Sequence, residues 1–544
     1  MNTPRPEYPN PVFMRKEWLN LNGEWSFSCG ECKKADKIIV PFCPESVLSG
    51  VGYTGFIKKV IYSRRFEIPA EWKGRRVFIH FGAADYHAKV YINGGFAGSH
   101  KGGYTPFAFD ITKFLVDGEN KVTVEAEDDL FSGNQPSGKQ SKRLESFGCF
   151  YTRTTGIWQT VWLEAVPKDY IVSVRIEANA EGNVRIAVNK TGEGIVKAEA
   201  FYNGESVCVI KNAGVIEMNI SDIHLWDIGQ GNLYDLTLTY GDDRVYSYFG
   251  LRSVSLENGD LLLNGRKVFG RWVLDQGFYP DGIYTAPDDD ALKNDIIYSM
   301  QLGFNGARLH QKLFEPRFLY WADKLGYMVW DEHANWGLDI SKAEAVENFL
   351  PEWLEGMERD FSHPSVIGWC PFNETWDTEG GKRQCDDVLR IVYEATKKFD
   401  NTRPVIDTSG NFHVITDIFD IHDYNQDKSQ FASHYDGHIF LNFTDRQTYR
   451  GEPYFVSEYG GIKWSEGENG GWGYGDAPKT REEFLDRYSS LTHTLLANDK
   501  ILGFCYTQLY DVEQEQNGLM TYDRKFKFEP EIIHKINTEK AAIE

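Results

Sequence analysis

The sequence is at first most informative for what it contains little of. It is 544 residues long and has no apolar run of about eighteen residues, the length that a membrane-spanning helix needs. The opening MNTPRP lacks the apolar core of a signal peptide. The eight cysteines are scattered without the spacing of a disulfide framework, which is typical of a reducing compartment. These absences predict a protein that is cytoplasmic or has lost its signal, with no membrane partner.

Positive charge is also scarce. The chain has 58 Lys and Arg against 80 Asp and Glu, a net charge of −22, which repels the phosphates of nucleic acids. Hydrophobic residues make up 41% and aromatic residues 15%, enough to build well-packed cores. Since 544 residues are too many for one core, we expect about three domains. The sequence indicates a globular multidomain protein that does not bind nucleic acid, and a homo-oligomer is compatible with it.

One cysteine pair, Cys29 and Cys32, has the spacing of half a zinc site. A structural zinc site needs four ligands, and no second pair lies nearby in the sequence. We therefore interpret the spacing as chance and expect no metal ion.

The first half of the chain is predicted to be all β. Residues 1–167 alternate apolar and polar side chains over short runs that are separated by turn formers such as Asn93-Gly94, without a convincing amphipathic helix. This pattern favours an antiparallel sandwich. Residues 168–256 repeat the pattern at about the size of an immunoglobulin-like sandwich. Within the first of these two segments, residues 129–155 form a polar excursion longer than a sandwich connection needs, and loops of this kind are often functional.

The second half changes period. From residue 257 to 544, apolar strand patterns alternate with helical patterns, with eight strand signals in all. Eight strands with intervening helices predict a (β/α)8 barrel. In such a barrel the catalytic residues lie at the carboxyl ends of the strands.

Two of these strands end in a glutamate. The apolar run before Glu374 and the one before Glu458 read as buried strands, which would deliver two carboxyl groups to one face of the barrel. Aromatic neighbours of Glu374, among them Trp369 and Phe372, are expected to remove water and favour its protonated form. Two carboxyl groups so placed are what glycoside hydrolysis requires, one as acid/base and one as nucleophile or base.

The motifs around these residues, FNETW and VSEYGG, resemble the acid/base and nucleophile motifs of glycoside hydrolase family 2, which contains β-galactosidases, β-glucuronidases and β-mannosidases. The resemblance implies a jelly-roll "sugar-binding" domain, an immunoglobulin-like domain and a catalytic TIM barrel. It also implies a retaining double displacement by Glu458 and Glu374, with carboxylates about 5–5.5 Å apart and no organic cofactor. An inverting hydrolase, with about 6.5–9.5 Å, and a non-catalytic carbohydrate-binding protein remain alternatives.

Further site residues follow from the strand ends and from the resemblance. Arg308 matches an arginine beside the nucleophile, Tyr424 a tyrosine that bonds it, and His310 a histidine that faces the sugar. Asn373 can hold a substrate hydroxyl. Four tryptophans in loops after strands could stack on sugar rings: Trp336, Trp376, Trp464 and Trp472. The predicted substrate-binding residues are Asn373, Arg308, His310, Tyr424, Asp275, Trp376 and Trp464.

The terminal sugar is predicted to be neutral. The Asn-x-Lys motif by which β-glucuronidases bind the sugar carboxylate is not found after Gln508, and residues 511–517 are acidic. A neutral sugar makes β-galactosidase the leading prediction, because it is the commonest neutral activity of the family. β-Glucuronidase, β-mannosidase and arabinosidase remain alternatives. Phe150 stands where several members carry an aspartate, and the Glu-x-His magnesium pattern is absent after Glu332.

Overall fold

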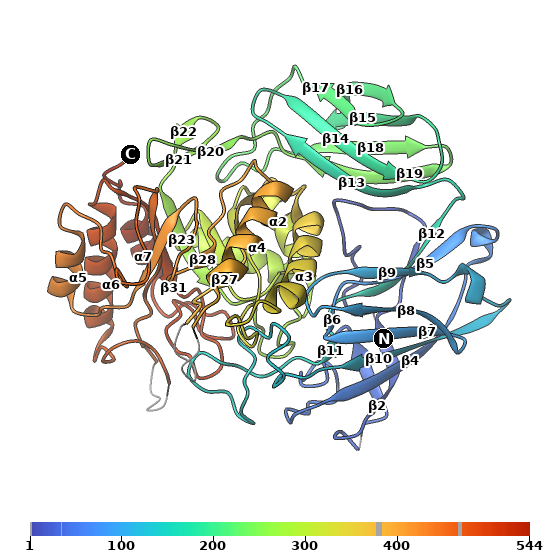
Figure 1. Cartoon of the computed structure of the whole chain (residues 1–544), viewed down its shortest axis with the longest axis horizontal. Coiled ribbons are helices and arrows are strands. Elements are labelled where there is room, and N and C mark those ends of the chain that lie inside the picture. The colour runs from blue at the N-terminus through green and yellow to red at the C-terminus, as the bar shows by residue number, and fades with distance from the viewer. Residues whose placement is uncertain (1–2, 34, 377–382, 466–470) are drawn as a thin grey trace.

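The computed structural model describes residues 3–33, 35–376, 383–465 and 471–544. Two β-sandwiches lie beside an α/β barrel, which occupies the left of the view in Figure 1. The predicted multidomain architecture of jelly roll, immunoglobulin-like sandwich and TIM barrel is confirmed. Within the described residues, no helix is both long enough and apolar enough to cross a membrane.

The first sandwich is a jelly roll of two antiparallel sheets. In its central strand β10 (Glu119–Glu127), Val122, Val124 and Ala126 are buried and alternate with more exposed polar residues, so one face of the sheet forms the core. The four-stranded sheet has the order β1 (Trp18–Asn20), β12 (Val161–Val166), β5 (Arg76–Phe81), β9 (Phe107–Asp110). The six-stranded sheet has the order β3 (Lys37–Val40), β2 (Gly23–Cys29), β4 (Lys59–Glu67), β10, β7 (His87–Ile92), β8 (Gly95–Lys101). A small pair joins β6 (Ala84–Asp85) to β11 (Gly156–Ile157).

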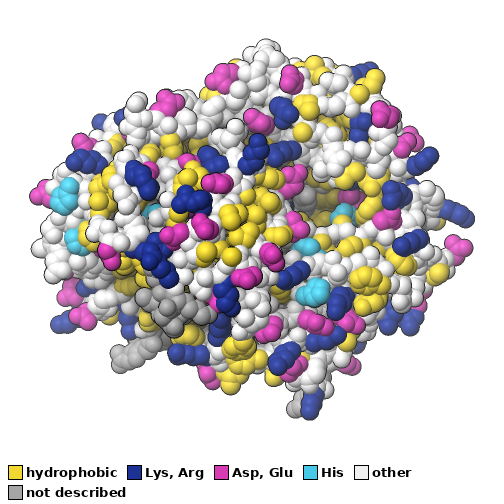
Figure 2. Space-filling view, viewed as in Figure 1, with side chains coloured by type: hydrophobic (Ala, Val, Ile, Leu, Met, Phe, Trp, Pro, Cys, Tyr) yellow, Lys and Arg dark blue, Asp and Glu magenta, His cyan; other side chains and the backbone are white. Residues whose placement is uncertain are grey.

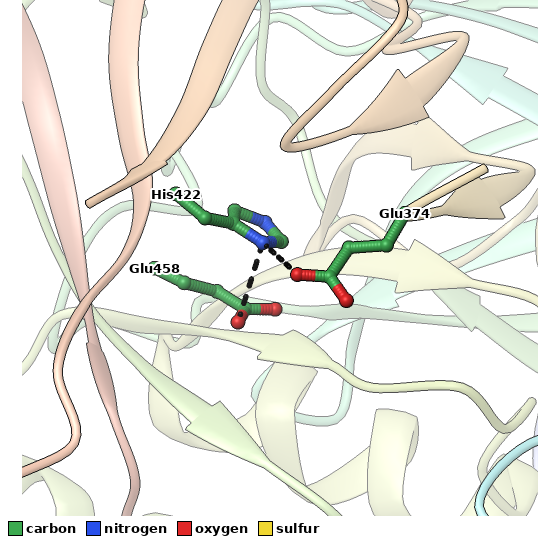
Figure 3. Close-up of side chains that lie close together, drawn as sticks. All are labelled: Glu374, His422 and Glu458. Carbon is green, nitrogen blue, oxygen red and sulfur yellow. Dashed lines mark hydrogen bonds and ion pairs between the residues drawn. The ribbon is translucent and has the colours of Figure 1, made fainter. Parts of the chain in front are cut away.

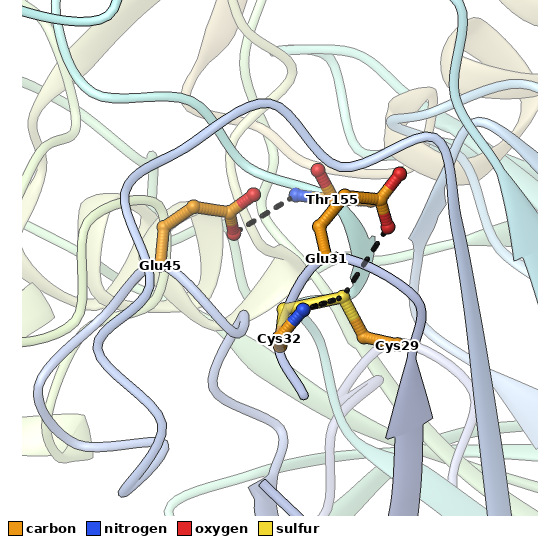
Figure 4. Close-up of a disulfide and its surroundings, with 5 residues drawn as sticks. All are labelled: Cys29, Glu31, Cys32, Glu45 and Thr155. Atoms are coloured by element: carbon orange, nitrogen blue, oxygen red, sulfur yellow. Dashed lines mark hydrogen bonds between the residues drawn. A yellow bond between two sulfur atoms is a disulfide. The ribbon is translucent and has the colours of Figure 1, made fainter. Parts of the chain in front are cut away.

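The cysteines at the end of β2 correct two expectations. Cys29 and Cys32 are joined by a disulfide, with Cα atoms 5.0 Å apart, and both are buried (Figure 4). The spacing is therefore a short-range cross-link and not chance. The remaining six cysteines are free thiols, so the expectation of an entirely reduced set is wrong for this pair.

The second sandwich is immunoglobulin-like. Its sheets have the orders β13 (Ile171–Ala178), β14 (Asn183–Lys190), β17 (Ile216–Asn219) and β16 (Glu205–Asn212), β15 (Val196–Tyr202), β18 (Tyr234–Tyr240), β19 (Asp243–Phe249). A buried arginine joins the two sandwiches, because Arg15 bonds Glu164 of the first at 2.8 Å and Asp243 of the second at 2.9 Å. A short sheet of β20 (Val254–Glu257), β21 (Asp260–Leu263) and β22 (Arg266–Lys267) leads into the barrel.

The barrel strands are parallel and almost entirely buried, so they are apolar on both faces and do not alternate. The sheet has the order β26 (Val366–Cys370), β25 (Met328–Glu332), β24 (Gly306–Leu309), β23 (Gly270–Asp275), β31 (Ile501–Thr507), β30 (Tyr454–Gly460), β29 (Phe419–Asp423). The fifth strand, predicted at residues 404–407, pairs with β26 through a single parallel bridge between Val405 and Trp369, and the ladder resumes in the next two residues. These two form β28 (Thr408–Ser409), which continues the barrel from β27 (Phe372–Asn373).

Helices cover the outside of the barrel. Capping side chains begin three of them: Asp288 accepts a bond from the Ala291 amide at 2.8 Å, Asp427 from the Gln430 amide at 2.9 Å, and Thr480 from the Glu483 amide at 3.2 Å. Five helices lie close to their predicted places: α1 (Asp289–Gln301), α2 (Pro316–Leu325), α3 (Ala345–Asp360), α4 (Asp386–Phe399) and α6 (Arg481–Leu496). Two helices of eight residues, α5 (Lys428–Tyr435) and α7 (Pro530–Asn537), were not predicted, because two turns are too short to show a clear apolar period.

The three domains meet around a hollow that is visible in Figure 2 between the sandwiches and the barrel. The cavity there has a volume of about 640 Å³ and is mainly apolar, with Phe107, Trp162, Val174 and Leu354 in its walls. Side chains of both charges cover the rest of the face in Figure 2.

Candidate active site

Glu458 lies in β30 at the barrel mouth and is held on both sides. Its Oε1 accepts a bond from Arg308 Nη1 at 2.8 Å, and its Oε2 accepts one from the hydroxyl of Tyr424. Its carboxyl is buried, which alone would raise the pKa of Glu458. The electrostatic attraction of His422 and Arg308 outweighs burial and lowers that pKa to about 2. Glu458 is therefore an ionised carboxylate at neutral pH.

Arg308 connects three strand ends. It is fully buried at the end of β24, and its Nε donates to Glu332 Oε2 of β25 at 2.6 Å. Its Nη2 donates to the side-chain oxygen of Asn373 in β27, and its Nη1 to Glu458. Burial opposes the charge of Arg308, but the two glutamates raise its pKa well above the usual value. The result is a fixed cation beside Glu458.

Glu374 follows β27 and has a different environment. Its φ is +42°, a left-handed conformation that is uncommon for a residue with a side chain. Its Oε1 lies 2.7 Å from His422 Nδ1, and the same nitrogen lies 3.4 Å from Glu458 Oε2 (Figure 3). One carboxylate oxygen of each glutamate and this nitrogen lie within 4.8 Å of one another. The side chain of Glu374 is 16% exposed against 6% for Glu458.

Two aromatic residues predicted to surround Glu374 lie elsewhere. The indole of Trp369 donates to Asp400 behind the barrel wall, and Phe372 stacks on Phe349 of α3 with ring centroids 4.3 Å apart. The prediction that they dehydrate the Glu374 carboxyl is wrong, because their side chains point into the packing between strands and helices.

Glu374, His422 and Glu458 form the one group among the described residues whose geometry could hold a metal ion. The Arg308 guanidinium 2.8 Å from Glu458 already supplies a positive charge to this carboxylate.

A pocket of about 40 Å³ opens over the two glutamates, and the first sandwich supplies part of its wall. Lys139 and Cys149 reach it from the polar excursion, residues 129–155, which crosses to the barrel mouth in Figure 1. Lys139 lies 4.2 Å from the ring centre of Trp336. Burial would lower the pKa of Lys139, but Cys149, Glu515 and the site carboxylates together raise it. The full lining is Lys139, Cys149, Leu274, Gln276, His310, Trp336, Asn373, Glu374, Tyr424, Glu458, Tyr474, Thr507 and Glu515.

The structure brings five predicted site residues into this pocket: Asn373, His310, Tyr424, Glu374 and Glu458. Arg308 lies directly behind Glu458. His310 is buried against Glu332, and burial lowers its pKa well below the usual value, so it is a neutral ring.

Three predicted residues lie outside this pocket. Asp275 does not line the pocket, but the next residue, Gln276, does. The Oδ1 atom of Asp275 accepts bonds from the Gly277 amide at 2.9 Å and from the hydroxyl of Tyr510. Trp464 packs in the core against Phe484 and Phe528. Trp376 is 44% exposed and lines a neighbouring pocket.

Several pocket residues were not predicted as site residues. His422 stands two residues before Tyr424 at the end of β29, where its position at a strand end was the available signal. Lys139 and Cys149 lie in the excursion that the sequence marks as unusual, but no pattern singles them out within it. The residues missed are Lys139, Cys149, Leu274, Gln276, Tyr474, Thr507 and Glu515 in the pocket lining, and His422 beside it.

Three models of known protein domains match parts of the chain. The model described as "Glycosyl hydrolases family 2, TIM barrel domain" matches residues 254–527, and those of the family's sugar-binding domain and central domain match residues 54–167 and 156–252. The chain belongs to glycosyl hydrolase family 2. It is 28% identical over 426 residues to a β-galactosidase of Thermoanaerobacter pseudethanolicus, covering 70% of this chain and 54% of that one.

Other family 2 proteins carry a second activity in their names. A β-glucuronidase of Streptococcus agalactiae is 23% identical over 418 residues, which cover 69% of each chain. A β-glucuronidase structure from Bifidobacterium dentium has a TM-score of 0.82 at 21% identity and covers 100% of both chains, a likeness that shows the shared fold. The chain spans 38% to 54% of the length of three relatives matched over 331 to 426 residues, two β-galactosidases and a putative β-glucuronidase of Formosa agariphila.

Proposed function

We propose that the protein is a retaining exo-β-glycosidase that removes a terminal sugar by double displacement. The observation that carries the proposal is the pair of carboxylates. Glu374 and Glu458 present oxygens within 4.8 Å of each other, which favours the retaining separation of about 5–5.5 Å over the inverting one of about 6.5–9.5 Å. The pocket over this pair is lined mostly by polar side chains, as a site for sugar hydroxyls requires.

Their surroundings divide the roles. Glu458 is held ionised by Arg308 and Tyr424, as a nucleophile must be. Its carboxylate attacks the anomeric carbon while Glu374 gives a proton to the leaving oxygen. Glu374 then takes a proton from water, which attacks the glycosyl ester, releases the sugar with retained configuration and restores the Glu458 carboxylate.

Other pocket residues are assigned to holding the sugar. The side-chain nitrogen of Asn373 is buried and has no hydrogen-bond partner among the described residues, and its oxygen accepts a bond from Arg308, so this nitrogen is available to a substrate oxygen. The side-chain oxygen of Gln276 is likewise buried and unpaired. These groups would donate to and accept from sugar hydroxyls.

We propose a neutral terminal sugar, with β-galactoside first. Glu515 lines the pocket, and both its oxygens are already engaged, by Asn517 at 3.0 Å and by the hydroxyl of Tyr151. The positive charge of Lys139 is balanced by the acidic groups of the same pocket. One observation favours β-glucuronide as second candidate, since Lys139 is a buried cation without a hydrogen-bonded anion among the described residues.

Hydrolysis of nitrophenyl β-galactoside, β-glucuronide, β-mannoside, β-glucoside and α-arabinopyranoside by the wild type and by Glu458→Gln tests the proposal. One sugar turned over by the wild type and lost in the variant, by about 10⁴-fold or more, supports the nucleophile and identifies the sugar. Turnover that survives the substitution would contradict the assignment of Glu458. Silence of the folded wild type across the panel would favour the non-catalytic binding protein.

A further inference from the structure

A separate pocket of about 270 Å³ lies where the immunoglobulin-like sandwich meets the barrel, and it shares no lining residue with the pocket over the two glutamates. The sandwich side contributes the end of β13 and the chain after β19, including Arg252. The barrel side contributes residues 361–364 and 401–403, the loops that follow α3 and α4. Because these loops lead into barrel strands, the pocket lies at the amino-terminal end of the barrel, opposite Glu374 and Glu458.

One wall of this pocket carries a buried arginine that has no anionic partner. Arg252 is 6% exposed, and its Nε and Nη2 donate to the carbonyls of Pro364 and Val366, each at 3.0 Å. Its third nitrogen, Nη1, has no hydrogen-bond partner among the described residues. Six of the eight buried arginines in the described chain form an ion pair with a carboxylate, but Arg252 does not. Its positive charge is therefore unpaired.

The carboxylates near Arg252 are already engaged by other partners. Asp400 pairs with Arg403 at 2.7 Å, and Asp323 pairs with His363 at 2.6 Å. Burial and, after it, the charge of Arg403 lower the pKa of Arg252 to about 9, although Asp400 and Asp323 oppose this shift. A negative charge in the pocket would compensate the buried cation.

Other polar groups of the pocket wall are also available to a ligand. His363 is fully buried, and its Nε2 has no hydrogen-bond partner among the described residues, while its Nδ1 lies 2.6 Å from Asp323. Asn401 is exposed at the rim, and its side chain makes no hydrogen bond within the described part of the chain. Glu177 is the one carboxylate among the described lining residues, and it is exposed. The interior of the pocket thus presents nitrogen atoms and no carboxylate of its own.

A phosphate group matches these nitrogens. Guanidinium groups bind phosphate oxygens strongly, and a side-chain amide can donate to a further oxygen. A phosphate monoester has a second pKa of about 6, so it exists with and without a proton near neutral pH. The Nε2 atom of His363 can accept from the protonated oxygen or, when the ring is charged, donate to the ionised one.

The pocket also has space for an organic group beside the phosphate. A volume of about 270 Å³ is larger than a phosphate ion fills. Phe249, Val254 and Phe361 contribute apolar side chains to the walls. A phosphorylated small molecule would use both parts of the pocket, with its phosphate at Arg252 and its carbon atoms on the apolar wall.

We propose that this pocket binds a small phosphate monoester, with Arg252 as the anchoring cation, His363 as a second phosphate contact and Asn401 at the rim. The site is distinct from the catalytic pocket, and the inference does not depend on the proposed glycosidase activity. Since Arg252 follows the last strand of the sandwich and the other two residues belong to the barrel, the ligand contacts two domains at once. Binding should therefore stabilise the folded chain.

Isothermal titration calorimetry of the full chain, in chloride buffer at constant ionic strength, tests the proposal with glycerol 3-phosphate, inorganic phosphate and glycerol. We expect one glycerol 3-phosphate per chain and no binding of glycerol. Arg252→Lys cannot contact both carbonyls and the phosphate, and Asn401→Asp places a negative charge at the rim. Each should weaken binding of glycerol 3-phosphate by at least about tenfold.

The matched control is Asn134→Asp, the same change of charge at an exposed asparagine in the excursion of the first sandwich. Its affinity for glycerol 3-phosphate should stay within about twofold of that of the wild type. Asn401→Asp keeps the test valid if Arg252→Lys does not fold, because the exposed Asn401 side chain makes no bond that folding needs.

The outcomes also identify the source of the phosphate. Tighter binding of glycerol 3-phosphate than of inorganic phosphate supports a monoester, and equal binding supports the same anion site with free phosphate as its ligand. Absence of binding for both would overturn the proposal. Binding that is unchanged in both Arg252→Lys and Asn401→Asp would place the anion elsewhere and overturn it as well.

Thermal unfolding gives an independent measurement. Saturating glycerol 3-phosphate should raise the melting temperature of the wild type by at least about 2 °C over sodium chloride of equal ionic strength. Asn134→Asp should keep this rise and Asn401→Asp should lose most of it. Equal melting temperatures of the wild type in the two solutions would contradict a ligand that binds the folded junction of two domains.

Discussion

The ends of β30 and β27 carry the two carboxylates of the site, and their surroundings differ. Glu458 has a regular strand conformation, is 6% exposed and receives bonds on both oxygens. Glu374 has φ +42°, is 16% exposed, and has one side-chain partner, His422, among the residues that the structure describes.

This difference suits the two roles. A nucleophile acts in one protonation state, so fixed neighbours that hold it ionised improve it. An acid/base must exist in both states during one turnover, and a carboxyl locked to a permanent cation could not give up and regain a proton easily. The structure places the permanent cation, Arg308, beside Glu458, whereas His422 lies 2.7 Å from Glu374 and 3.4 Å from Glu458.

The substitution Glu374→Gln tests most directly whether the two carboxylates have different roles. Because the amide cannot protonate the leaving oxygen, we expect a loss of about 10³-fold in kcat/KM for methyl glycosides or disaccharides. A dinitrophenyl glycoside leaves without a proton, so its loss should be below about tenfold. Steady-state kinetics on both substrates checks this. Equal losses would mean that Glu374 does not act as the acid.

A substitution of Arg308 that keeps its positive charge but not its guanidinium shape should lower activity less than Glu374→Gln does. Arg308→Lys cannot contact Glu332, Asn373 and Glu458 together, and we expect kcat to fall by about 10²-fold. Since Arg308 helps to hold the pKa of Glu458 near 2, the acidic limb of kcat/KM should move to higher pH in the variant.

Arg317→Lys is the matched control, because Arg317 pairs with Asp289 between helices away from the site. A pH profile of Arg308→Lys that coincides with that of the wild type would show that Arg308 does not set the charge of the nucleophile.

The partner of Glu374 should have a smaller effect. In His422→Gln the bond to Glu374 is lost or altered, and we expect about tenfold lower kcat/KM, more on methyl than on nitrophenyl glycosides. His434→Gln serves as control, since His434 makes a similar bond to Asp423 at 2.7 Å outside the pocket. Losses of kcat/KM that do not depend on the leaving group would mean that His422 supports the fold and does not assist proton transfer.

The comparison extends to protein stability through Glu45, a buried carboxyl that has no ion pair among the described residues. Burial raises the pKa of Glu45 to about 8. The pKa of Glu458 is instead lowered, because His422 and Arg308 lie beside it. Below the unfolded value of about 4.5 both states are protonated; between about 4.5 and 8 the unfolded state releases a proton that the folded state keeps. Glu45 therefore lowers stability progressively as pH rises through this window.

Glu45→Gln removes that titration. We expect its melting temperature to fall less than that of the wild type between pH 5 and pH 8, by at least about 3 °C. Differential scanning calorimetry measures it, with the half-exposed Glu24→Gln as control. An identical pH dependence in Glu45→Gln and the wild type would contradict a protonated Glu45.

Much of the architecture could be predicted from sequence because it rests on local patterns. The alternation of apolar and polar residues identifies β10, and buried apolar runs identify β26 and β30. Motifs place Glu374 and Glu458. The fifth barrel strand was predicted only in part: Val405 bridges Trp369, but the two residues that pair with β27 are too few to give a pattern.

The errors at the site have a geometric cause. Which side of a strand end faces the pocket depends on barrel closure, so Gln276 lines the pocket where Asp275 was expected. Lys139 is contributed by a different domain, more than 300 residues before Glu458 in sequence, and such long-range contact leaves no local signal. Trp464 follows a catalytic strand but turns into the core, which no composition of the loop reveals.

The central claim is that Glu458 attacks the sugar and Glu374 does not. A dinitrophenyl 2-deoxy-2-fluoroglycoside of the sugar that the wild type hydrolyses should trap the glycosyl-enzyme, because the fluorine slows its hydrolysis more than its formation. Mass spectrometry of a peptide digest then locates the ester. The account predicts one sugar per chain on the peptide that contains Glu458. A label on Glu374, or inactivation without any covalent sugar, would contradict it.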